Sequence, residues 1–234
     1  MERVEKGHMQ KIFLKGRECC LALPRDRRKY PLLTVICGAN EELLQELAKR
    51  FPHMLLFAPS IQWERDFTPW PAPGLSAETP FLGEASAYLS FLEQEALPFL
   101  EKNYLVQSTA KTKALVGYSL GGLFAAWAIY QSAAFGCCAS VSGSLWYDGF
   151  LDFAASHRPM AKSAYLSLGK GEERTRNRRM RIVGECTRAF AEILQGQLGA
   201  AHVCLEWNPG GHTSEVPMRI SKALAFFEEN IERK

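Results

Sequence analysis

The residue most able to do chemistry is a serine between two glycines. The motif Gly117-Tyr118-Ser119-Leu120-Gly121 follows a short apolar run and precedes a segment with an apolar helical stripe. On such a turn between a strand and a helix, the serine hydroxyl is exposed above the sheet, and the glycines let neighbouring backbone approach. The free N–H groups of the helix point toward the oxygen of an attacked carbonyl. We therefore predict that Ser119 is a nucleophile, in preference to a helix cap.

A serine hydroxyl needs a general base, and three histidines follow Ser119: His157, His202 and His212. In sheet-based hydrolases the chain order is serine, acid, histidine. His157 lies in a polar stretch without a preceding strand, and His202 opens an apolar run that favours a structural role. His212 follows that run after a Pro-Gly-Gly turn, in a loop suited to a general base at the edge of a sheet. We predict His212 as the base.

The histidine in turn needs a carboxylate to orient it. Asp148 and Asp152 follow the serine too soon after the preceding strand to be the preferred candidates. A strand expected at 163–168 is followed by two glutamates, and the ends of parallel strands meet at one edge of a sheet. Glu172 is the first choice for the acid and Glu173 the second. For Glu173, a role in the first turn of the next helix is favoured.

An oxyanion hole requires two N–H donors. The residue after the nucleophile, Leu120, supplies the first, and the loop after the strand that ends at Gly38 supplies the second. That second donor is Ala39 or Asn40, and the backbone alone makes the interaction.

A long connection from 59 to 79 contains four prolines and two tryptophans. Long loops of this kind are usually functional or packed as part of a pocket. We predict that six aromatic residues bind substrate, and packing in the core is the alternative role. These residues are Trp63, Phe67, Trp70, Tyr118, Trp146 and Tyr147.

Hydrophobic periodicity predicts the elements that position these residues. Strands are expected near 11–15, 18–23, 32–37, 53–58, 113–117, 136–141, 163–168 and 202–207. Helices are expected near 41–50, 82–102, 120–131, 176–196 and 215–231. After a first hairpin the strands alternate with helices, which predicts a single α/β domain over residues 1–234. Its sheet of about eight strands is mostly parallel, with helices on both faces.

Composition excludes several classes of function. The 234 residues are 47% hydrophobic and 23% charged, with a formal net charge of +3, which is typical of one soluble domain. The charge is too evenly mixed to indicate nucleic-acid binding. Its one concentration, the arginines between 174 and 181, is interpreted as a solvent-facing helix surface in preference to an anion site.

No apolar run is long enough to span a bilayer, and the first ten residues lack the apolar core of a signal peptide. We therefore expect no membrane partner and a cytoplasmic location. The seven cysteines occur as adjacent pairs or singly in expected strands and a helix, which favours small buried side chains over disulfides or metal ligands. No metal and no cofactor are expected.

Four segments carry a resemblance to a known family: GYSLGGLFAAWAIY, SVSGSLWYD, SLGKGEERTRN and LEWNPGGHTSEVPMRISKAL. In order and spacing they resemble the esterases of the esterase D type in the α/β-hydrolase superfamily, nearest the branch with the siderophore esterases. The resemblance implies an α/β-hydrolase fold with Ser119 as nucleophile, His212 as base and Glu172 as acid. Two positions depart from the family: Cys37 stands where many siderophore-type relatives have aspartate before glycine, and Lys170 stands where some small esterases have aspartate. Because the segment of the acid is the least specific part of the resemblance, a Ser-His dyad is the alternative to the triad.

The combined prediction is a serine esterase that hydrolyses small-molecule carboxylic esters through an acyl-enzyme. A siderophore trilactone esterase and an acyltransferase with the same triad are the alternatives. A peptidase is disfavoured by the resemblance, and a non-catalytic binding module by the intact serine and histidine motifs.

Overall fold

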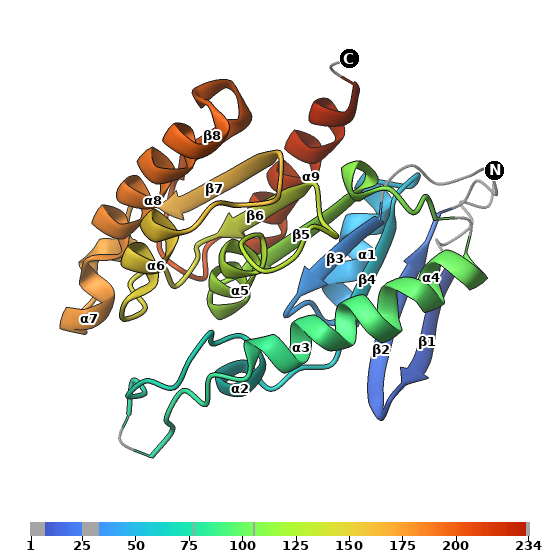
Figure 1. The fold of residues 1–234 in the computed structure, drawn as a ribbon, viewed down its shortest axis with the longest axis horizontal. Coiled ribbons are helices and arrows are strands. Elements are labelled where there is room, and N and C mark those ends of the chain that lie inside the picture. Colours follow the sequence, from blue (N-terminus) through green and yellow to red (C-terminus); the bar gives the residue numbers. More distant parts are fainter. Residues whose placement is uncertain (1–7, 25–32, 77, 105, 233–234) are drawn as a thin grey trace.

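The computed structural model describes residues 8–24, 33–76, 78–104 and 106–232. They form an eight-stranded sheet in the order β1-β2-β4-β3-β5-β6-β7-β8 (Figure 1). The strands are β1 (His8–Leu14), β2 (Arg17–Leu23), β3 (Leu33–Cys37), β4 (Leu55–Pro59), β5 (Lys113–Tyr118), β6 (Cys137–Val141), β7 (Ser163–Gly169) and β8 (Val203–Asn208). Strand β2 pairs antiparallel with both β1 and β4, and all other neighbouring strands pair in parallel. The predicted strands and mostly parallel sheet are confirmed.

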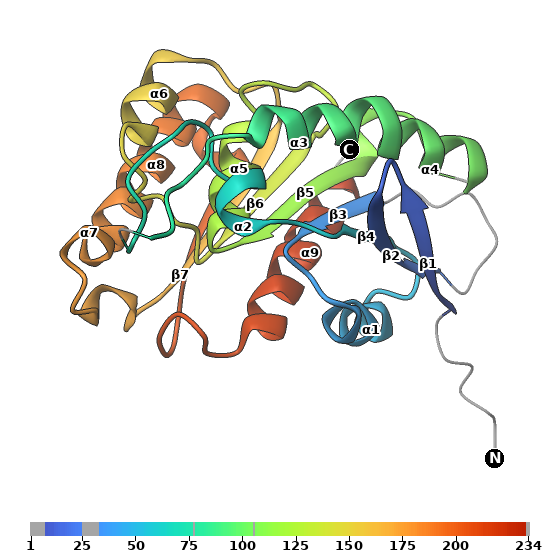
Figure 2. The same ribbon diagram turned by 90° about the horizontal axis from the view of Figure 1, so that it is seen from below.

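Helices cover both faces of the sheet, as Figure 2 shows from below. One face carries α1 (Glu41–Arg50) and α9 (Val216–Glu232). The other face carries α3 (Ala85–Phe91), α4 (Leu97–Asn103), α5 (Leu120–Ala128), α6 (Phe150–Ser156) and α8 (Val183–Leu198). This two-faced cover matches the predicted architecture.

The central strands show why the sheet needs helices on both of its faces. In β5, Leu115 packs into the core beneath α5, whereas Ala114 and Val116 pack into the core beneath α9. All three side chains are at most 1% exposed. Because successive side chains point to opposite faces, a continuous apolar run needs a helical layer on each side.

Some helices differ from their predicted extents. The helix expected at 82–102 is α3 and α4 joined by a π-helical turn, η1 (Leu92–Ala96). Pro98 follows this turn and has no N–H to donate to a preceding carbonyl, which is a recognised cause of irregular helical bonding. The helix expected at 176–196 begins as the short α7 (Arg178–Arg181) before α8.

The sequence did not predict two short helices, α2 (Trp63–Asp66) and α6. Within the long connection, α2 forms a single turn, and α6 follows β6 closely. Figures 1 and 2 both place this connection beside α7, and Arg179 donates to the carbonyl of Gly74 at 3.4 Å. The connection is therefore packed onto the body of the protein near the carboxyl ends of the strands.

The cysteines form no disulfide bonds within the described residues. All seven are free, and five of them are buried. Within the part of the chain that the structure describes, no helix has the length and apolar character needed to cross a bilayer.

Candidate functional site

Ser119 lies on a strained turn between β5 and α5. Its backbone has φ 58° and ψ −124°, a conformation that L-residues rarely adopt. The flanking glycines make the turn sterically feasible. A Cβ at Gly117 would lie 1.9 Å from the carbonyl oxygen of Gly121, and one at Gly121 would lie 2.7 Å from that of Cys37. The strand, the helix and the end of β3 therefore meet at distances that only glycine permits.

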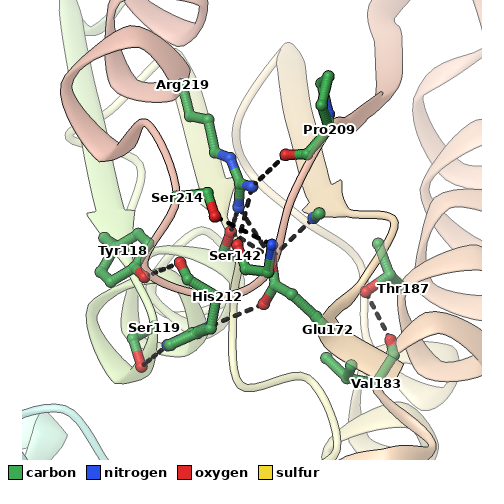
Figure 3. Close-up of polar contacts among 12 residues, drawn as sticks. Tyr118, Ser119, Ser142, Glu172, Val183, Thr187, Pro209, His212, Ser214 and Arg219 are labelled. Atoms are coloured by element: carbon green, nitrogen blue, oxygen red, sulfur yellow. Dashed lines mark hydrogen bonds and ion pairs between the residues drawn. The ribbon is translucent and has the colours of Figure 1, made fainter. Parts of the chain in front are cut away.

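His212 reaches the serine from the loop between β8 and α9. Its Nε2 lies 3.1 Å from Ser119 Oγ, and its Nδ1 lies 2.6 Å from Glu172 Oε2 (Figure 3). The structure thus brings together the three residues for which the sequence predicts chemistry.

Tyr118, the residue before Ser119, contacts this histidine and the backbone of its loop. Its ring centroid lies 4.9 Å from that of His212 with an interplanar angle of 32°, and its hydroxyl donates to the His212 carbonyl (Figure 3). Burial and the Glu172 charge raise the pKa of Tyr118 to about 12. The phenol therefore keeps its proton at neutral pH and stays a donor. In this structure Tyr118 positions the histidine loop, which differs from the substrate-binding role predicted for it.

Glu172 is held by one oxygen and offers the other to the histidine. Its Oε1 accepts from the Gly169 N–H at 2.7 Å, Ser142 Oγ at 2.8 Å and Arg219 Nη1 at 2.9 Å. Its Oε2 faces His212. Burial favours the neutral acid, but the hydrogen bonds from His212, Gly169 and Ser142 outweigh burial, so the pKa of Glu172 is lowered from its ordinary 4.5.

An ionised carboxylate only accepts hydrogen bonds, which fixes the tautomer of the histidine. The proton of the neutral imidazole lies on Nδ1, facing Glu172. Nε2 is then the acceptor and faces the Ser119 hydroxyl. This is the arrangement that a general base requires.

Backbone hydrogen bonds join the turn that carries Glu172 to the loop that carries His212. Lys170 N–H donates to the Asn208 carbonyl at 2.8 Å, and Gly171 N–H donates to the Gly210 carbonyl at 2.9 Å. A Cβ at Gly169 would lie 2.6 Å from the Gly210 oxygen. The two segments therefore lie too close for any other residue at position 169.

Sequence reasoning missed two residues of this network, Ser142 and Arg219. Arg219 is 0% exposed on α9, and its Nη2 donates to the carbonyls of Pro209 at 2.8 Å and Gly211 at 2.9 Å. Its Nη1 donates to Ser142 Oγ at 2.9 Å as well as to Glu172. Figure 3 shows this guanidinium between the acid and the backbone that precedes His212. The signal in the sequence is an arginine four residues before the buried Ala223, on the apolar side of the last helix.

The predicted oxyanion-hole residues lie at the start of α5 and just after β3. Leu120 opens α5, and the close approach of Gly121 to the Cys37 carbonyl brings the end of β3, two residues before Ala39, next to the start of α5. Asn40 is the N-cap of α1, and its Oδ1 accepts from the Leu43 N–H at 2.9 Å. That the N–H of Ala39 or Asn40 donates to an oxyanion stays a prediction.

A cavity of about 200 Å³ opens beside His212. Its lining comes from the segments after β6, β7 and β8 and from the start of α8. The lining residues are Ser142, Gly143, Trp146, Gly171, Glu172, Arg174, Thr175, Met180, Val183 and His212. Of the six aromatic residues predicted to bind substrate, Trp146 lines this cavity.

Other predicted pocket residues pack elsewhere. Phe67 is 0% exposed and packs edge-on against Tyr88, with centroids 5.6 Å apart, so it is a core residue and not a wall of the site. Tyr147 is 2% exposed and is likewise part of the core. Trp70 is half-buried, and its Nε1 donates to the Asp148 carbonyl at 2.9 Å. Through its contacts with Asp148 and Tyr147, Trp70 attaches the long connection to the segment after β6.

Trp63 has a different position from the other predicted aromatic residues. It is half-buried on α2, and a Cβ at Gly38 would lie 2.4 Å from its ring. Trp63 therefore covers the turn that precedes Ala39, next to the predicted oxyanion hole.

The alternative acids lie away from the histidine ring. Glu173 pairs with Arg188 at 3.2 Å, in a half-exposed position. Asp148 is exposed and pairs with Arg179 at 2.7 Å. Of the candidate carboxylates, Glu172 is the one that contacts His212. Within residues 8–24, 33–76, 78–104 and 106–232, no cluster of three or more histidine, cysteine or acidic residues could hold a metal ion.

The fold of the chain resembles those of several solved hydrolases. An IroE-like serine hydrolase from Shewanella oneidensis superposes with a TM-score of 0.74 at 18% identity, over 96% of this chain and 79% of the other. The siderophore hydrolase EstB from Aspergillus nidulans superposes with a TM-score of 0.71 at 16% identity, over 97% and 96% of the two chains. The fold is therefore that of the α/β hydrolases.

Sequence comparison identifies the family within that fold. The family model described as "Putative esterase" matches residues 22–214. A protein of Bacillus subtilis (strain 168), described as uncharacterized protein YbbA, is 32% identical over 185 residues, which is 72% of this chain and 74% of that protein. The chain belongs to this esterase family, as the resemblance in its sequence implied.

Proposed function

We propose that the protein is a serine esterase that hydrolyses carboxylic esters through an acyl-enzyme intermediate. The observation that supports this most strongly is the chain of hydrogen bonds from Ser119 through His212 to Glu172, with the serine on a strained turn. A serine that only capped α5 would need neither the strained backbone nor the oriented imidazole. Membership of the esterase family supports the same reaction class.

In the first half-reaction, His212 Nε2 takes the proton of Ser119, and Oγ attacks the ester carbonyl. The imidazolium that forms is stabilised by the Glu172 carboxylate at Nδ1. Collapse of the tetrahedral intermediate breaks the ester bond, and His212 returns the proton to the departing alcohol. In the second half-reaction, water attacks the acyl-enzyme by the same sequence of steps and releases the acid.

The negative charge on the carbonyl oxygen is stabilised by the backbone. The Leu120 N–H at the start of α5 and an N–H of Ala39 or Asn40 would donate to the oxyanion. The helix dipole of α5 adds to this stabilisation because its N-terminus faces the site.

Siderophore esters are the second substrate class to test, because siderophore hydrolases are among the proteins with a similar fold. An acyltransfer to an alcohol would use the same acyl-enzyme. A panel of short 4-nitrophenyl esters, feruloyl esters, acetylated sugars and catecholate trilactones, assayed with and without added alcohol, separates these outcomes.

The proposed nucleophile is tested by labelling and by substitution. We expect a fluorophosphonate to label Ser119 and block ester hydrolysis. Ser119→Ala should abolish labelling and lower kcat by about 10⁶-fold, the loss seen when a serine hydrolase loses its nucleophile. Ser86→Ala, at an exposed position on α3, is the matched control and should leave both unchanged. A label found on another residue by mass spectrometry would contradict the assignment.

A further inference from the structure

The cavity beside His212 has an apolar wall and a basic rim. Trp146, Met180 and Val183 supply the wall, and Arg174 contributes a permanent positive charge. The wall is fixed in place, because the Arg179 guanidinium lies 5.3 Å from the centroid of the Trp146 ring, which is only 5% exposed. A substrate group that enters the cavity would therefore meet an apolar surface and then a cation.

The nearby carboxylates are already committed to other partners. Glu172 pairs with the Arg219 guanidinium and accepts a hydrogen bond from His212. Glu173 turns away from the cavity toward Arg188, and its carboxylate lies against Gly184, where a Cβ would be 2.1 Å from Oε1. No carboxylate of this segment remains to neutralise the cavity rim.

Arg174 itself has no carboxylate partner within the described part of the chain. The residue is exposed, yet it lines the cavity. By contrast, Arg179 in the same basic segment is bound by Asp148. Arg174 is solvent-facing, as the sequence interpretation expects, but it precedes α7 and lies at the cavity, so it is not part of the surface of that helix.

We propose that this cavity binds an anionic group of the substrate, so that the enzyme prefers carboxylic esters that also carry a carboxylate. The preference rests on the proposed esterase function, because it concerns the substrate of that same site. Arg174 acts as a specificity-determining residue that pairs with the substrate carboxylate, and Trp146 and Val183 contact the carbon chain between that carboxylate and the ester.

The dimensions of the cavity limit the substrate portion that it accepts. A volume of about 200 Å³ equals that of roughly seven water molecules at about 30 Å³ each. A short dicarboxylic chain or a single aromatic ring with a carboxylate is of this size. The anionic group belongs to a compact part of the ester, on either the acyl or the alcohol side.

Two pairs of synthetic esters test the preference on both sides of the ester bond. The acyl pair is 4-nitrophenyl hydrogen glutarate and its neutral methyl ester. The alcohol pair is 4-acetoxybenzoate and its neutral methyl ester. In at least one pair, kcat/KM should be higher for the anion. Arg174→Gln should lower that anion-to-neutral ratio about two- to fivefold, as expected for loss of an ion pair at an exposed arginine. Arg174→Glu should lower the ratio further.

Arg178→Gln is the matched control. Arg178 is exposed on α7, has no carboxylate partner among the described residues and does not line the cavity. Its variant should keep the wild-type ratio. An equal fall of the anion-to-neutral ratio in Arg174→Gln and Arg178→Gln would show a general effect of surface charge and overturn the proposed anion site. A wild-type enzyme that prefers the neutral ester in both pairs would overturn it as well.

A binding measurement separates this proposal from the esterase function. Calorimetric titration of 4-acetoxybenzoate into the Ser119→Ala protein needs no turnover. Binding that is weakened by Arg174→Gln in that background supports the anion site even if no ester is hydrolysed. Hydrolysis of neutral esters without such binding would retain the proposed function and reject the anion site.

Discussion

Replacement of Glu172 by glutamine tests the geometry of the site most directly, because the structure fixes which way the amide must point. Three donors converge on Oε1, from Gly169, Ser142 and Arg219. The amide oxygen must take that position, since an NH₂ group there would face donors only. The NH₂ group then occupies the Oε2 position, 2.6 Å from His212 Nδ1.

The expected consequence is an inverted histidine tautomer. A donor opposite Nδ1 requires Nδ1 to accept, so the imidazole proton moves to Nε2 and the ring can no longer take the Ser119 proton. In a serine hydrolase of known mechanism, the corresponding acid-to-amide change lowers kcat about 10⁴-fold. That factor is about 5.4 kcal/mol in activation free energy, at about 1.36 kcal/mol per factor of ten. We expect a loss of this size in Glu172→Gln.

The assay must separate this loss from unfolding, because the substitution also removes the charge that neutralises the buried Arg219. The amide oxygen still accepts from Arg219, so the loss of stability should stay below the roughly 3–5 kcal/mol typical of a broken buried pair. Steady-state turnover of a 4-nitrophenyl ester is therefore measured well below the thermal midpoint found by circular dichroism.

Glu173→Gln is the matched control for this variant. Its half-exposed pair with Arg188 contributes at most about 1 kcal/mol, and kcat should stay within about twofold of wild type. A folded Glu172→Gln protein with kcat within tenfold of wild type would refute the tautomer argument and favour a Ser-His dyad. The reverse ranking of the two variants would assign the acid to Glu173.

Two further predictions concern stability. Gly117→Ala should destabilise the fold by at least about 3 kcal/mol, the upper end of the usual range for overpacking, because its Cβ would lie 1.9 Å from a backbone oxygen. Gly196→Ala, on α8 with open space around its Cβ, should instead stabilise by up to about 1 kcal/mol; urea unfolding of both variants checks this contrast. Because the folded pKa of Glu172 lies below its ordinary 4.5, its contribution to stability is present above that pH and is lost as the pH falls through the folded pKa. The free energy of unfolding should therefore fall with acid less steeply in Glu172→Gln than in wild type, and parallel curves would contradict the shift.

The sheet could be predicted from the sequence because its signals are local. Each apolar run between turn residues became a strand, and the alternation of runs with helical stripes indicated a mostly parallel sheet. The turn at Ser119 carries its own signature, since the glycines at 117 and 121 are required by contacts within a few residues or with the adjacent β3. Local patterns of this kind depend little on the rest of the chain.

The supporting network could not be predicted because its partners are distant in the sequence. Arg219 contacts residues 47 and 77 positions away, and nothing near it in α9 indicates a buried charge partner. The substrate-binding role predicted for Phe67 was wrong for a different reason. A residue such as Phe67 suits a pocket wall and a core equally well by composition, and only the packing against Tyr88 decides.

The arrangement of the site divides it into two rigid units. Glu172 and His212 belong to one unit, because Glu172 and the loop before His212 share Arg219 and are joined by the backbone bonds of Lys170 and Gly171. Ser119 belongs to the other unit, fixed by the glycine contacts of its turn. The two units touch through the 3.1 Å contact between Ser119 and His212 and through Tyr118, which donates to the His212 carbonyl. On the proposed mechanism, the proton transfer from Ser119 to His212 crosses the contact between the two units.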